Sequence, residues 1–339
     1  MQRALVVLAI AALTSACSSD APGLAADGAD GSVMDGSSPP KDGGAGNDRG
    51  TEASASPPAP SGCIDDVSPG DHVYTCEGLR VDARIPAACE HPGCGLILEL
   101  HGDTGTGLLI DEHLKLRDLG ALHGYVVFAP TGPPYGGGQP GSTWSQANDA
   151  SLVTMTRLFA SVFRVDDKKI HATGFSRGGF VTWRLLCEAS NLFASFAPAA
   201  AGDGPANGDV TCFAGTSPTR QADLLFLMGR TDGAVPYSSM VTIRDAAITS
   251  YGGAGPQVVM SNADYTHNRW TNSAGVVIET FDHAYETVND GPWASAKGHC
   301  VPGSTMDPYA PQYAVPCKLP NAFGWGEEVM KFFMAHPKN

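Results

Sequence analysis

Short apolar runs alternate with amphipathic segments along the chain from Cys63 onward. The runs at residues 95–100 (GLILEL) and 125–130 (YVVFAP) are apolar on both faces, which is typical of strands buried in a parallel sheet. Between them, residues 108–123 place apolar side chains at helical spacing. This alternation predicts a doubly wound, mostly parallel sheet that is covered by helices on both faces.

The same alternation continues to the end of the chain. Leu152, Met155 and Phe159 recur at helical spacing, and Asp149 is placed to cap the start of that helix. Further buried strands are expected at residues 169–175, 193–200, 224–228 and 276–281, the last one after a hairpin turn at 272–275. Further helices are expected from residue 177 to about residue 188 and from 323 to 335.

Residues 1–17 have the pattern of an export signal. Arg3 supplies a positive charge, and residues 4–13 form an apolar stretch that is too short to span a bilayer. The following sequence LTSAC resembles a bacterial lipobox, although its leucine lies one position further upstream than usual. We therefore expect a lipid on Cys17 that attaches the protein to the outer membrane or cell surface of a bacterium. The alternative is ordinary signal cleavage and a free secreted protein.

Residues 18–62 differ sharply in composition from the rest of the chain. They contain nine glycines, six prolines and eight serines, and no aromatic residue. Such a segment cannot bury enough apolar surface to offset the entropy lost on ordering, so it is predicted to be a disordered tether. Residues 63–339 are then expected to form one globular domain, which we expect to be a monomer.

The charge balance excludes two classes of partner. The 339-residue chain has 21 Lys and Arg against 35 Asp and Glu, a formal net charge of −14. Nucleic-acid binding requires a basic surface that neutralises phosphates, and capture by anionic lipid headgroups requires basic clusters. We therefore expect neither partner.

A G-x-S-x-G motif formed by Gly174, Ser176 and Gly178 joins the predicted strand at 169–175 to the next helix. In that context the motif is typical of a strained turn that lifts a nucleophilic serine above the sheet, because only small flanking residues let strand and helix approach so closely. The helix N-terminus adds N–H groups and a dipole that favour negative charge. The alternative is a glycine-rich turn with an ordinary capping serine.

A serine hydroxyl becomes a good nucleophile only with a base that is oriented by an acid. Asp232 follows the predicted strand at 224–228 and is the candidate acid, with a plain Asp-Gly turn as the alternative. Asp223 is a weaker candidate because it precedes that strand and so belongs to the opposite edge of the sheet.

The candidate base is a histidine on a loop after the last strand. His299 fits that place best. His283 is the second candidate, although it lies at or in the strand itself, and His267 comes too early in the chain. With Ser176 and Asp232, His299 completes the chain order serine, acid, histidine.

A developing oxyanion needs two N–H donors that are fixed in place beforehand. One expected donor is the backbone N–H of Arg177, the residue after the candidate nucleophile. The other is expected from the loop after residues 95–100, from the N–H of either Asp103 or Thr104. The alternative for this loop is a glycine-rich turn without a catalytic role.

Together these residues resemble the α/β-hydrolase superfamily, and within it most closely the secreted polyhydroxybutyrate depolymerase and feruloyl esterase group. The resemblance runs from about Arg80 to the C-terminal helix. It implies that residues 63–339 are an α/β-hydrolase catalytic domain without a large lid domain, and a serine carboxylesterase that acts on an ester or polyester without a metal or an organic cofactor. A peptidase or amidase with the same triad and an inactive surface-binding module are the alternatives.

Two positions depart from the pattern of that group, in which the residue at 177 is usually small or amide-bearing and the residue at 103 is seldom acidic. A bare carboxylate beside a developing oxyanion opposes catalysis. We therefore predict that Asp103 and Arg177 form an ion pair, with their charged atoms within about 6 Å.

Four aromatic residues fall in segments expected near the carboxyl edge of the sheet, where ligands bind in such folds. As alternatives to simple packing residues, they are candidate walls of the substrate site: Trp144, Tyr135, Tyr237 and Trp293. Residues 133–141 (PPYGGGQPG) are expected to form a flexible rim loop.

Eight cysteines remain after Cys17, an even number in a chain with an export signal. Disulfides are therefore favoured over metal ligands, since no Cys/His cluster has zinc-like spacing followed by a second pair. The expected pairs join neighbours along the chain: Cys63–Cys76, Cys89–Cys94, Cys187–Cys212 and Cys300–Cys317. The last pair would brace the loop that carries His299.

Overall fold

The computed structural model describes residues 57–136, 141–202, 212–213, 215–287, 294–306 and 316–339. All of them belong to the second of the two units into which the chain divides, Ala53–Asn339. The signal segment, Cys17, most of the predicted tether and Trp293 lie outside the described residues.

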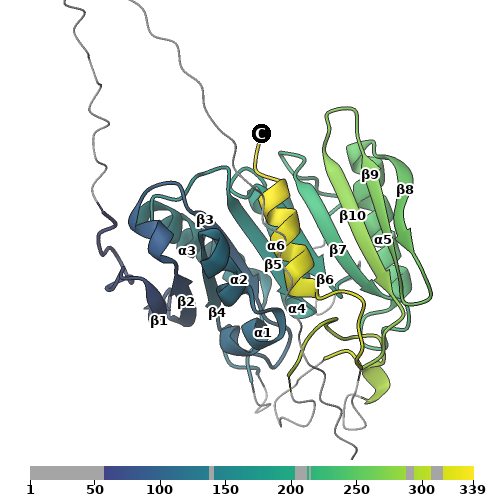
Figure 1. Cartoon of the computed structure of the whole chain (residues 1–339), viewed down its shortest axis with the longest axis horizontal. Coiled ribbons are helices and arrows are strands. Elements are labelled where there is room, and N and C mark those ends of the chain that lie inside the picture. The colour runs from purple at the N-terminus through teal and green to yellow at the C-terminus, as the bar shows by residue number, and fades with distance from the viewer. Residues whose placement is uncertain (1–56, 137–140, 203–211, 214, 288–293, 307–315) are drawn as a thin grey trace, which may run out of the picture. The chain divides into compact units, whose positions relative to one another are not determined.

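Ten strands form one sheet with helices on both faces (Figure 1). The strands are β1 (Gly70–Cys76), β2 (Leu79–Ile85), β3 (Gly95–Leu100), β4 (Tyr125–Pro130), β5 (Ile170–Phe175), β6 (Ser195–Ala199), β7 (Asp223–Gly229), β8 (Ala254–Ser261), β9 (Tyr265–Thr271) and β10 (Val277–His283). The helices are α1 (Gly107–Leu114), α2 (Leu116–His123), α3 (Asp149–Val162), α4 (Arg177–Ala189), α5 (Tyr237–Tyr251) and α6 (Trp325–Ala335), with short 3-10 turns at Ala87–Glu90, Gln146–Asn148 and Ala294–Ala296.

The strand order is β1-β2-β4-β3-β5-β6-β7-β10-β9-β8. The six central strands from β4 to β10 are parallel, whereas β1, β2, β9 and β8 add antiparallel pairs at the two edges. The predicted, mostly parallel sheet is therefore confirmed, and it is a doubly wound sheet with antiparallel borders.

Each central strand contributes to two apolar cores because successive side chains point to opposite faces. On β3, Leu96 and Leu98 join the core under α3, α4 and α5, whereas Ile97 joins the core under α1, α2 and α6. Figure 1 shows α1, α2 and α6 on the same side of the sheet. This two-sided burial explains why the strands are apolar on both faces.

The helix predicted at residues 108–123 is instead two helices, α1 and α2. Lys115 breaks the helix with a left-handed φ of 55°. The Asp111 carboxylate stabilises this break, because it accepts hydrogen bonds from the backbone N–H of Arg117 at 2.7 Å and from the Arg117 Nε at 2.9 Å. The helical spacing persists across the break, so the hydrophobic pattern alone did not reveal it.

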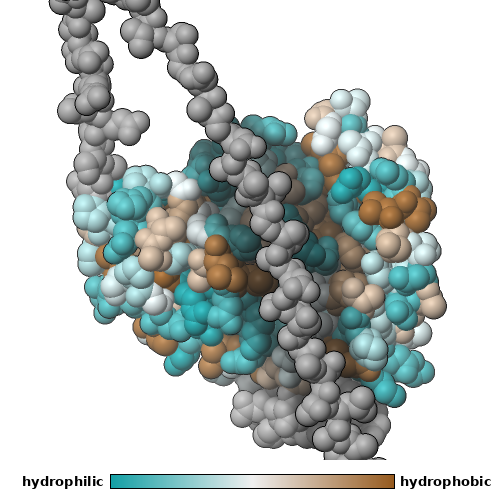
Figure 2. Space-filling view, in the orientation of Figure 1, coloured by the Kyte–Doolittle hydropathy of each residue, from teal (hydrophilic) through white to brown (hydrophobic). Residues whose placement is uncertain are grey.

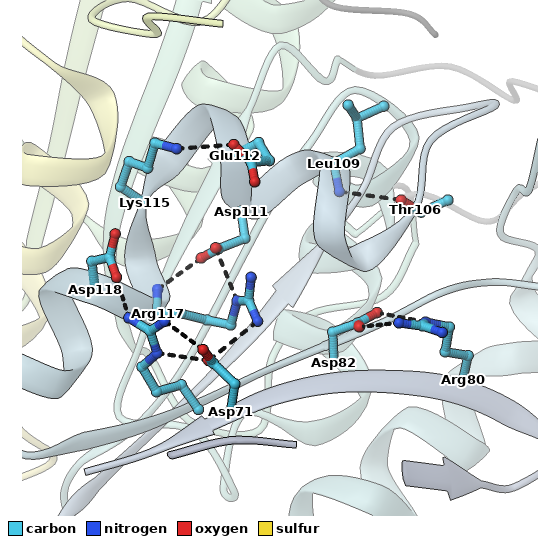
Figure 3. Close-up of polar contacts among 11 residues, drawn as sticks. Asp71, Arg80, Asp82, Thr106, Leu109, Asp111, Glu112, Lys115, Arg117 and Asp118 are labelled. Carbon is cyan, nitrogen blue, oxygen red and sulfur yellow. Dashed lines mark hydrogen bonds and ion pairs between the residues drawn. The ribbon is translucent and has the colours of Figure 1, made fainter. Parts of the chain in front are cut away.

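A network of charged side chains joins α1 and α2 to the first two strands (Figure 3). Arg84 on β2 pairs with Asp71 on β1 and with Asp118 on α2, and Arg117 joins Asp71 to Asp111 on α1. The network therefore holds α1 against the sheet edge. Because α1 follows directly on the loop after β3, the network also fixes one end of that loop.

The role expected for Asp149 is wrong. Asn148 precedes α3 and Asp149 is its first residue, and the Asp149 carboxylate points into the molecule. There it binds Arg184 of α4 through two hydrogen bonds of 2.6 and 2.9 Å, and both side chains are 2% exposed. The carboxylate thus forms a buried ion pair between two helices.

Three of the four predicted disulfides are present: Cys63–Cys76, Cys187–Cys212 and Cys300–Cys317. The fourth predicted pair, Cys89–Cys94, is not bonded, since both residues are buried free thiols. The two thiols nevertheless contact each other, and they also lie near the Gly124 and Phe163 carbonyls.

The edge strand β8 exposes apolar side chains, among them Val258 and Met260. Figure 2 shows brown surface at this edge of an otherwise mainly polar face. Its ladder with β9 has register shifts at two places, and Pro256 lacks a backbone N–H. Such irregularities oppose the addition of another strand. None of the helices in the described part of the chain is both long and apolar enough to span a membrane.

Candidate active site

Ser176 lies on the tight turn between β5 and α4, as the G-x-S-x-G motif predicts. Its φ of 54° and ψ of −118° are rare for a residue with a side chain and mark a strained backbone. Backbone hydrogen bonds fix the turn, because the Ser176 N–H donates to the Ala199 carbonyl and the Ser176 carbonyl accepts from the Phe180 N–H. The turn therefore holds the hydroxyl at the carboxyl edge of the sheet.

Glycines at both flanks of Ser176 have the steric role expected of them. A Cβ on Gly174 would lie 2.4 Å from the Gly178 carbonyl oxygen, so the strand and the helix cannot otherwise approach so closely. A Cβ on Gly178 would lie 2.2 Å from the Leu100 carbonyl oxygen at the end of β3. The turn can therefore pack against β3 only without side chains at these two positions.

Asp232 and His299 are hydrogen-bonded partners. The His299 Nδ1 lies 2.7 Å from one Asp232 carboxylate oxygen, and the other oxygen accepts the backbone N–H groups of Ala234 and Val235 at 2.8 and 2.7 Å. Both side chains are buried, with 0% and 7% exposed for Asp232 and His299. One Asp232 oxygen is thus held by the backbone of its own loop, and the other orients the imidazole.

The loops that carry the acid and the histidine pack tightly on each other. The Gly298 N–H donates to the Thr231 carbonyl, and a Cβ on Gly298 would lie 2.8 Å from the Asp232 nitrogen. The His299 ring lies 4.8 Å from the ring of Phe175, the residue before Ser176. The structure therefore brings the three predicted residues to the same edge of the sheet, where the carboxyl ends of β5, β7 and β10 meet (Figure 1).

Ser176 and His299 are not joined by a hydrogen bond in the described part of the chain. Catalytic hydrogen bonds are often long in ligand-free enzymes and shorten when substrate binds. The Cys300–Cys317 disulfide directly follows His299 and fixes the far side of its loop.

The competing candidates have other partners. His283 ends β10, is 1% exposed, and has its pKa lowered to about 3, mainly by burial. His267 binds Glu279 at 2.6 Å on the face of the sheet, and Asp223, at the amino end of β7, binds His336 at 3.1 Å. None of them is the hydrogen-bond partner of Asp232.

The loop after β3, residues 101–106, lies against Ser176, since a Cβ on Gly102 would lie 3.2 Å from the Ser176 Cβ. We call it the oxyanion loop. The Thr104 N–H donates to the Ser142 carbonyl at 2.7 Å and is therefore not free to bind an oxyanion, which corrects the alternative that names Thr104 as the donor. The Asp103 N–H has no acceptor in the described part of the chain.

The second expected donor belongs to Arg177. This residue begins α4, so its N–H lies in the first helical turn, where the helix itself supplies no acceptor. The Asp103 and Arg177 N–H groups thus flank Ser176 from the oxyanion loop and from the helix.

Two buried rings hold the oxyanion loop in place. The His101 Nδ1 lies 2.7 Å from the Gly102 carbonyl oxygen, and the Gly132 N–H donates to the His101 Nε2 at 2.9 Å. Burial lowers the pKa of His101 to about 4, so the ring is neutral and can accept at Nε2. The Trp144 indole N–H donates to the His101 carbonyl. Sequence reasoning missed this positioning role of His101.

The expected substrate contact of Trp144 does not fit its position. Trp144 is 2% exposed and packs against His101, with ring centroids 4.9 Å apart. It therefore stabilises the oxyanion loop through its contacts with His101. Tyr135 and Tyr237 are half-buried, and the Tyr237 hydroxyl donates to an Asp282 carboxylate oxygen at 3.2 Å.

The predicted ion pair between Asp103 and Arg177 is present. The Arg177 Nε lies 3.3 Å from the Asp103 Oδ1, well within the expected distance. The Thr143 hydroxyl donates to the same oxygen. Sequence reasoning missed Thr143, for which only its place beside Trp144 was a signal.

One group of potential metal ligands occurs among the described residues. His283, Cys300 and Cys317 bring their ligand atoms within 4.8 Å of one another. The two sulfurs are joined in a disulfide and so offer no thiolate, which is the form of cysteine that binds metals. This group therefore does not fit a metal site.

No protein-family model matches the chain. A stretch of 152 residues, 44% of the chain, is 24% identical to the bifunctional acetylxylan esterase/xylanase XynS20E of Neocallimastix patriciarum. The match spans 21% of the length of that longer protein.

Solved structures are also similar to this chain. The acetyl xylan esterase from Aspergillus awamori superposes with a TM-score of 0.51 and 17% identity, over 63% of this chain and 92% of that chain. A thermostable esterase superposes with a TM-score of 0.47 and 15% identity, over 79% of this chain and 62% of that chain. Together with the sheet order and the turn at Ser176, the first of these likenesses establishes that the chain has the α/β-hydrolase fold.

Proposed function

We propose that this protein is a serine carboxylic ester hydrolase that works through an acyl-enzyme. The observation that carries the proposal is the buried Asp232–His299 hydrogen bond, held beside the strained turn of Ser176. The acetylxylan esterase names of the sequence relative and of the structural neighbour support ester chemistry.

In this reaction the Ser176 hydroxyl attacks the ester carbonyl. His299 donates its Nδ1–H to Asp232, which leaves Nε2 to take the serine proton and return it to the departing alcohol. Asp232 stabilises the imidazolium that forms, because its other oxygen is already fixed by two backbone N–H groups. Water then hydrolyses the acyl-enzyme by the same steps.

The negative charge on the carbonyl oxygen is stabilised by the N–H groups of Asp103 and Arg177. Each such donor typically contributes about 10²–10³-fold in rate, because it is in place before the charge develops. The ion pair between the two side chains offsets part of the negative charge that the Asp103 carboxylate would otherwise place beside the oxyanion.

The acyl group of the substrate is also proposed, from the resemblance to feruloyl esterases and polyester depolymerases. A feruloyl or polyhydroxybutyrate-type ester and a short acetyl ester are the substrates to compare. The three disulfides support an extracellular protein, with secretion or a lipid on Cys17 as the proposed route.

The test is a substrate panel measured on the protein and on S176A. We expect hydrolysis of p-nitrophenyl acetate and of at least one of methyl ferulate, polyhydroxybutyrate and acetylated xylan, with an initial burst of p-nitrophenol that S176A lacks. Cleavage of dipeptide amides without cleavage of any ester would instead identify a peptidase. A folded protein that cleaves none of these compounds would contradict the proposal and favour a binding module.

A further inference from the structure

Asp103 connects three segments that surround Ser176. It belongs to the oxyanion loop, and its Oδ1 accepts hydrogen bonds from Thr143, in the loop after β4, and from the Nε of Arg177, at the start of α4. A Cβ on Gly141 would lie 2.3 Å from the Thr104 carbonyl oxygen, so the loop after β4 packs directly on the oxyanion loop. The carboxylate is therefore part of the wall of the site.

The two members of the ion pair are unequally exposed. The Arg177 side chain is 5% exposed, whereas the Asp103 side chain is 32% exposed. The side that faces solvent is thus the carboxylate and not the guanidinium. The Asp103 Oδ2 has no hydrogen-bond partner in the described part of the chain, so the loop beside Ser176 carries a carboxylate oxygen with free lone pairs.

We propose that Asp103 determines specificity by accepting a hydrogen bond from a hydroxyl group of the substrate close to the scissile ester. The substrates would then be esters of polyhydroxy alcohols, and esters with a carboxylate at that place would be rejected. This inference rests on the proposed ester hydrolase function. It assigns Asp103 a second role beside that of its backbone N–H.

The chemistry of a partly exposed carboxylate supports this role. An ionised carboxylate offers only acceptors, so it selects for a donor such as a hydroxyl group. A hydrogen bond to a charged group is stronger than one between neutral groups, and a second carboxylate at the same place would be repelled. The hydrogen bond from the buried Arg177 Nε goes to Oδ1 and not to Oδ2.

The test compares three acetyl esters that differ only in the alcohol: glycerol monoacetate, propyl acetate and 3-acetoxypropanoate. The first carries hydroxyl groups, the second carries none, and the third carries a carboxylate. We expect the unaltered protein to have the highest kcat/KM for glycerol monoacetate and the lowest for 3-acetoxypropanoate. Added salt should reduce the disadvantage of the anionic ester, which is a readout that needs no variant.

The variant D103N replaces the unbound acceptor Oδ2 by a donor. Thr143 and Arg177 both donate to Oδ1, so the amide oxygen takes that position and the amide NH2 replaces Oδ2. We expect KM for glycerol monoacetate to rise about 10- to 100-fold relative to propyl acetate. We also expect kcat/KM for 3-acetoxypropanoate to rise, because the repulsion is gone.

The variant T143V is the matched control, since it removes a donor to Oδ1 and leaves Oδ2 in place. We expect T143V to loosen the oxyanion loop and to lower kcat for all three esters by the same factor. If D103N gave that uniform loss, or changed nothing, Asp103 would have no part in specificity and the inference would be overturned. If the unaltered protein cleaved no ester at all, the proposed function itself would fail.

Discussion

At the scale of single residues, two buried side chains of the site, Asp232 and His101, each hold two partners. Both Asp232 oxygens are used, one by backbone N–H groups and one by His299. The neutral His101 ring connects two loops in the same way. Such residues tolerate little change, because the loss of one partner leaves another buried group unsatisfied.

Replacing Asp232 by Asn should abolish most activity and leave the fold intact. The amide no longer fixes the imidazole tautomer that leaves Nε2 unprotonated, so kcat should fall on the order of 10⁴-fold. The measurement is steady-state hydrolysis of p-nitrophenyl acetate, with circular dichroism to verify folding. D223N is the matched control. Asp223 begins β7, whereas Asp232 follows the end of that strand, so D223N should retain kcat. Equal activity of the two variants would contradict the assigned acid.

Glu99 on β3 should make the protein less stable as the pH rises. It is wholly buried, neither carboxyl oxygen has a partner in the described residues, and burial and then the charge of Asp111 raise its pKa well above the ordinary value of 4.5. The folded state therefore keeps a proton that the unfolded chain releases above about pH 4.5. Stability from this group is present below that pH and is lost as the pH approaches the folded pKa.

The variant E99Q mimics the protonated form at all pH values. In urea unfolding, the free energy of unfolding of E99Q minus that of the unaltered protein should be larger at pH 8 than at pH 5. E112Q, at a half-exposed position on α1, should show no such pH-dependent difference. A loss of stability that is equal at pH 5 and pH 8 would show that Glu99 is not protonated in the folded protein.

At the scale of elements, the site is assembled from loops that tertiary contacts brace. The oxyanion loop is held by α1 and its charged network, and the His299 loop is held by its packing on the Asp232 loop and by a disulfide. The oxyanion loop contains no helix or strand, and the described part of the His299 loop has only a short 3-10 turn at Ala294–Ala296. Their geometry therefore depends on bonds between residues far apart in the sequence.

Loss of the Cys300–Cys317 disulfide should reduce both stability and activity. Its sequence separation of 17 residues corresponds to about 3 kcal/mol in the chain-entropy model. The variant C300S/C317S should also lower kcat about tenfold or more, because His299 loses its support. The variant C63S/C76S opens a similar loop of 13 residues away from the site and should lose stability alone. Equal kcat in the two variants would exclude a role of the bridge in holding His299.

The sequence predicted those elements that local pattern determines. The turn at Ser176 follows from Gly174 and Gly178 on its two sides, and the buried strands follow from apolar runs such as β3 and β4. The break at Lys115 was missed because it depends on a contact of Asp111 with Arg117 and not on a glycine or proline. Asp149 was misassigned because its partner lies 35 residues away on α4.

The same distinction applies to the site. The Asp232–His299 contact and the Asp103–Arg177 pair could be predicted, since each residue stands next to a recognisable motif. Thr143 could not, because its hydroxyl reaches Asp103 across 40 residues of sequence. The occupied N–H of Thr104 could not be predicted either, because its acceptor is the Ser142 carbonyl of another loop.

At the scale of the whole molecule, buried histidines determine the response to acid. Burial lowers the pKa of His101 and His113 to about 4 and of His171 and His283 to about 3. Below about pH 6.5 the unfolded chain binds protons at these positions and the folded protein does not. These groups therefore stabilise the protein above pH 6.5, and that contribution is lost as the pH falls.

The free energy of unfolding should fall steeply between pH 6.5 and pH 4.5. Four protons taken up on unfolding correspond to about 5 kcal/mol per pH unit near the lower end of this range. Urea unfolding at half-unit pH steps measures the slope, and H171N should reduce it by about one proton. A stability that is constant across this range would contradict the neutral, buried state of these rings.

Covalent labelling shows whether Ser176 is a nucleophile activated by His299 and Asp232. Folded protein is treated with a fluorophosphonate, and the adduct is located by mass spectrometry of intact protein and of peptides. We expect one adduct for each chain, on the peptide that contains Ser176, with slow labelling of H299A and none of S176A. An absence of labelling in folded protein, or an adduct that persists in S176A, would contradict this role of Ser176.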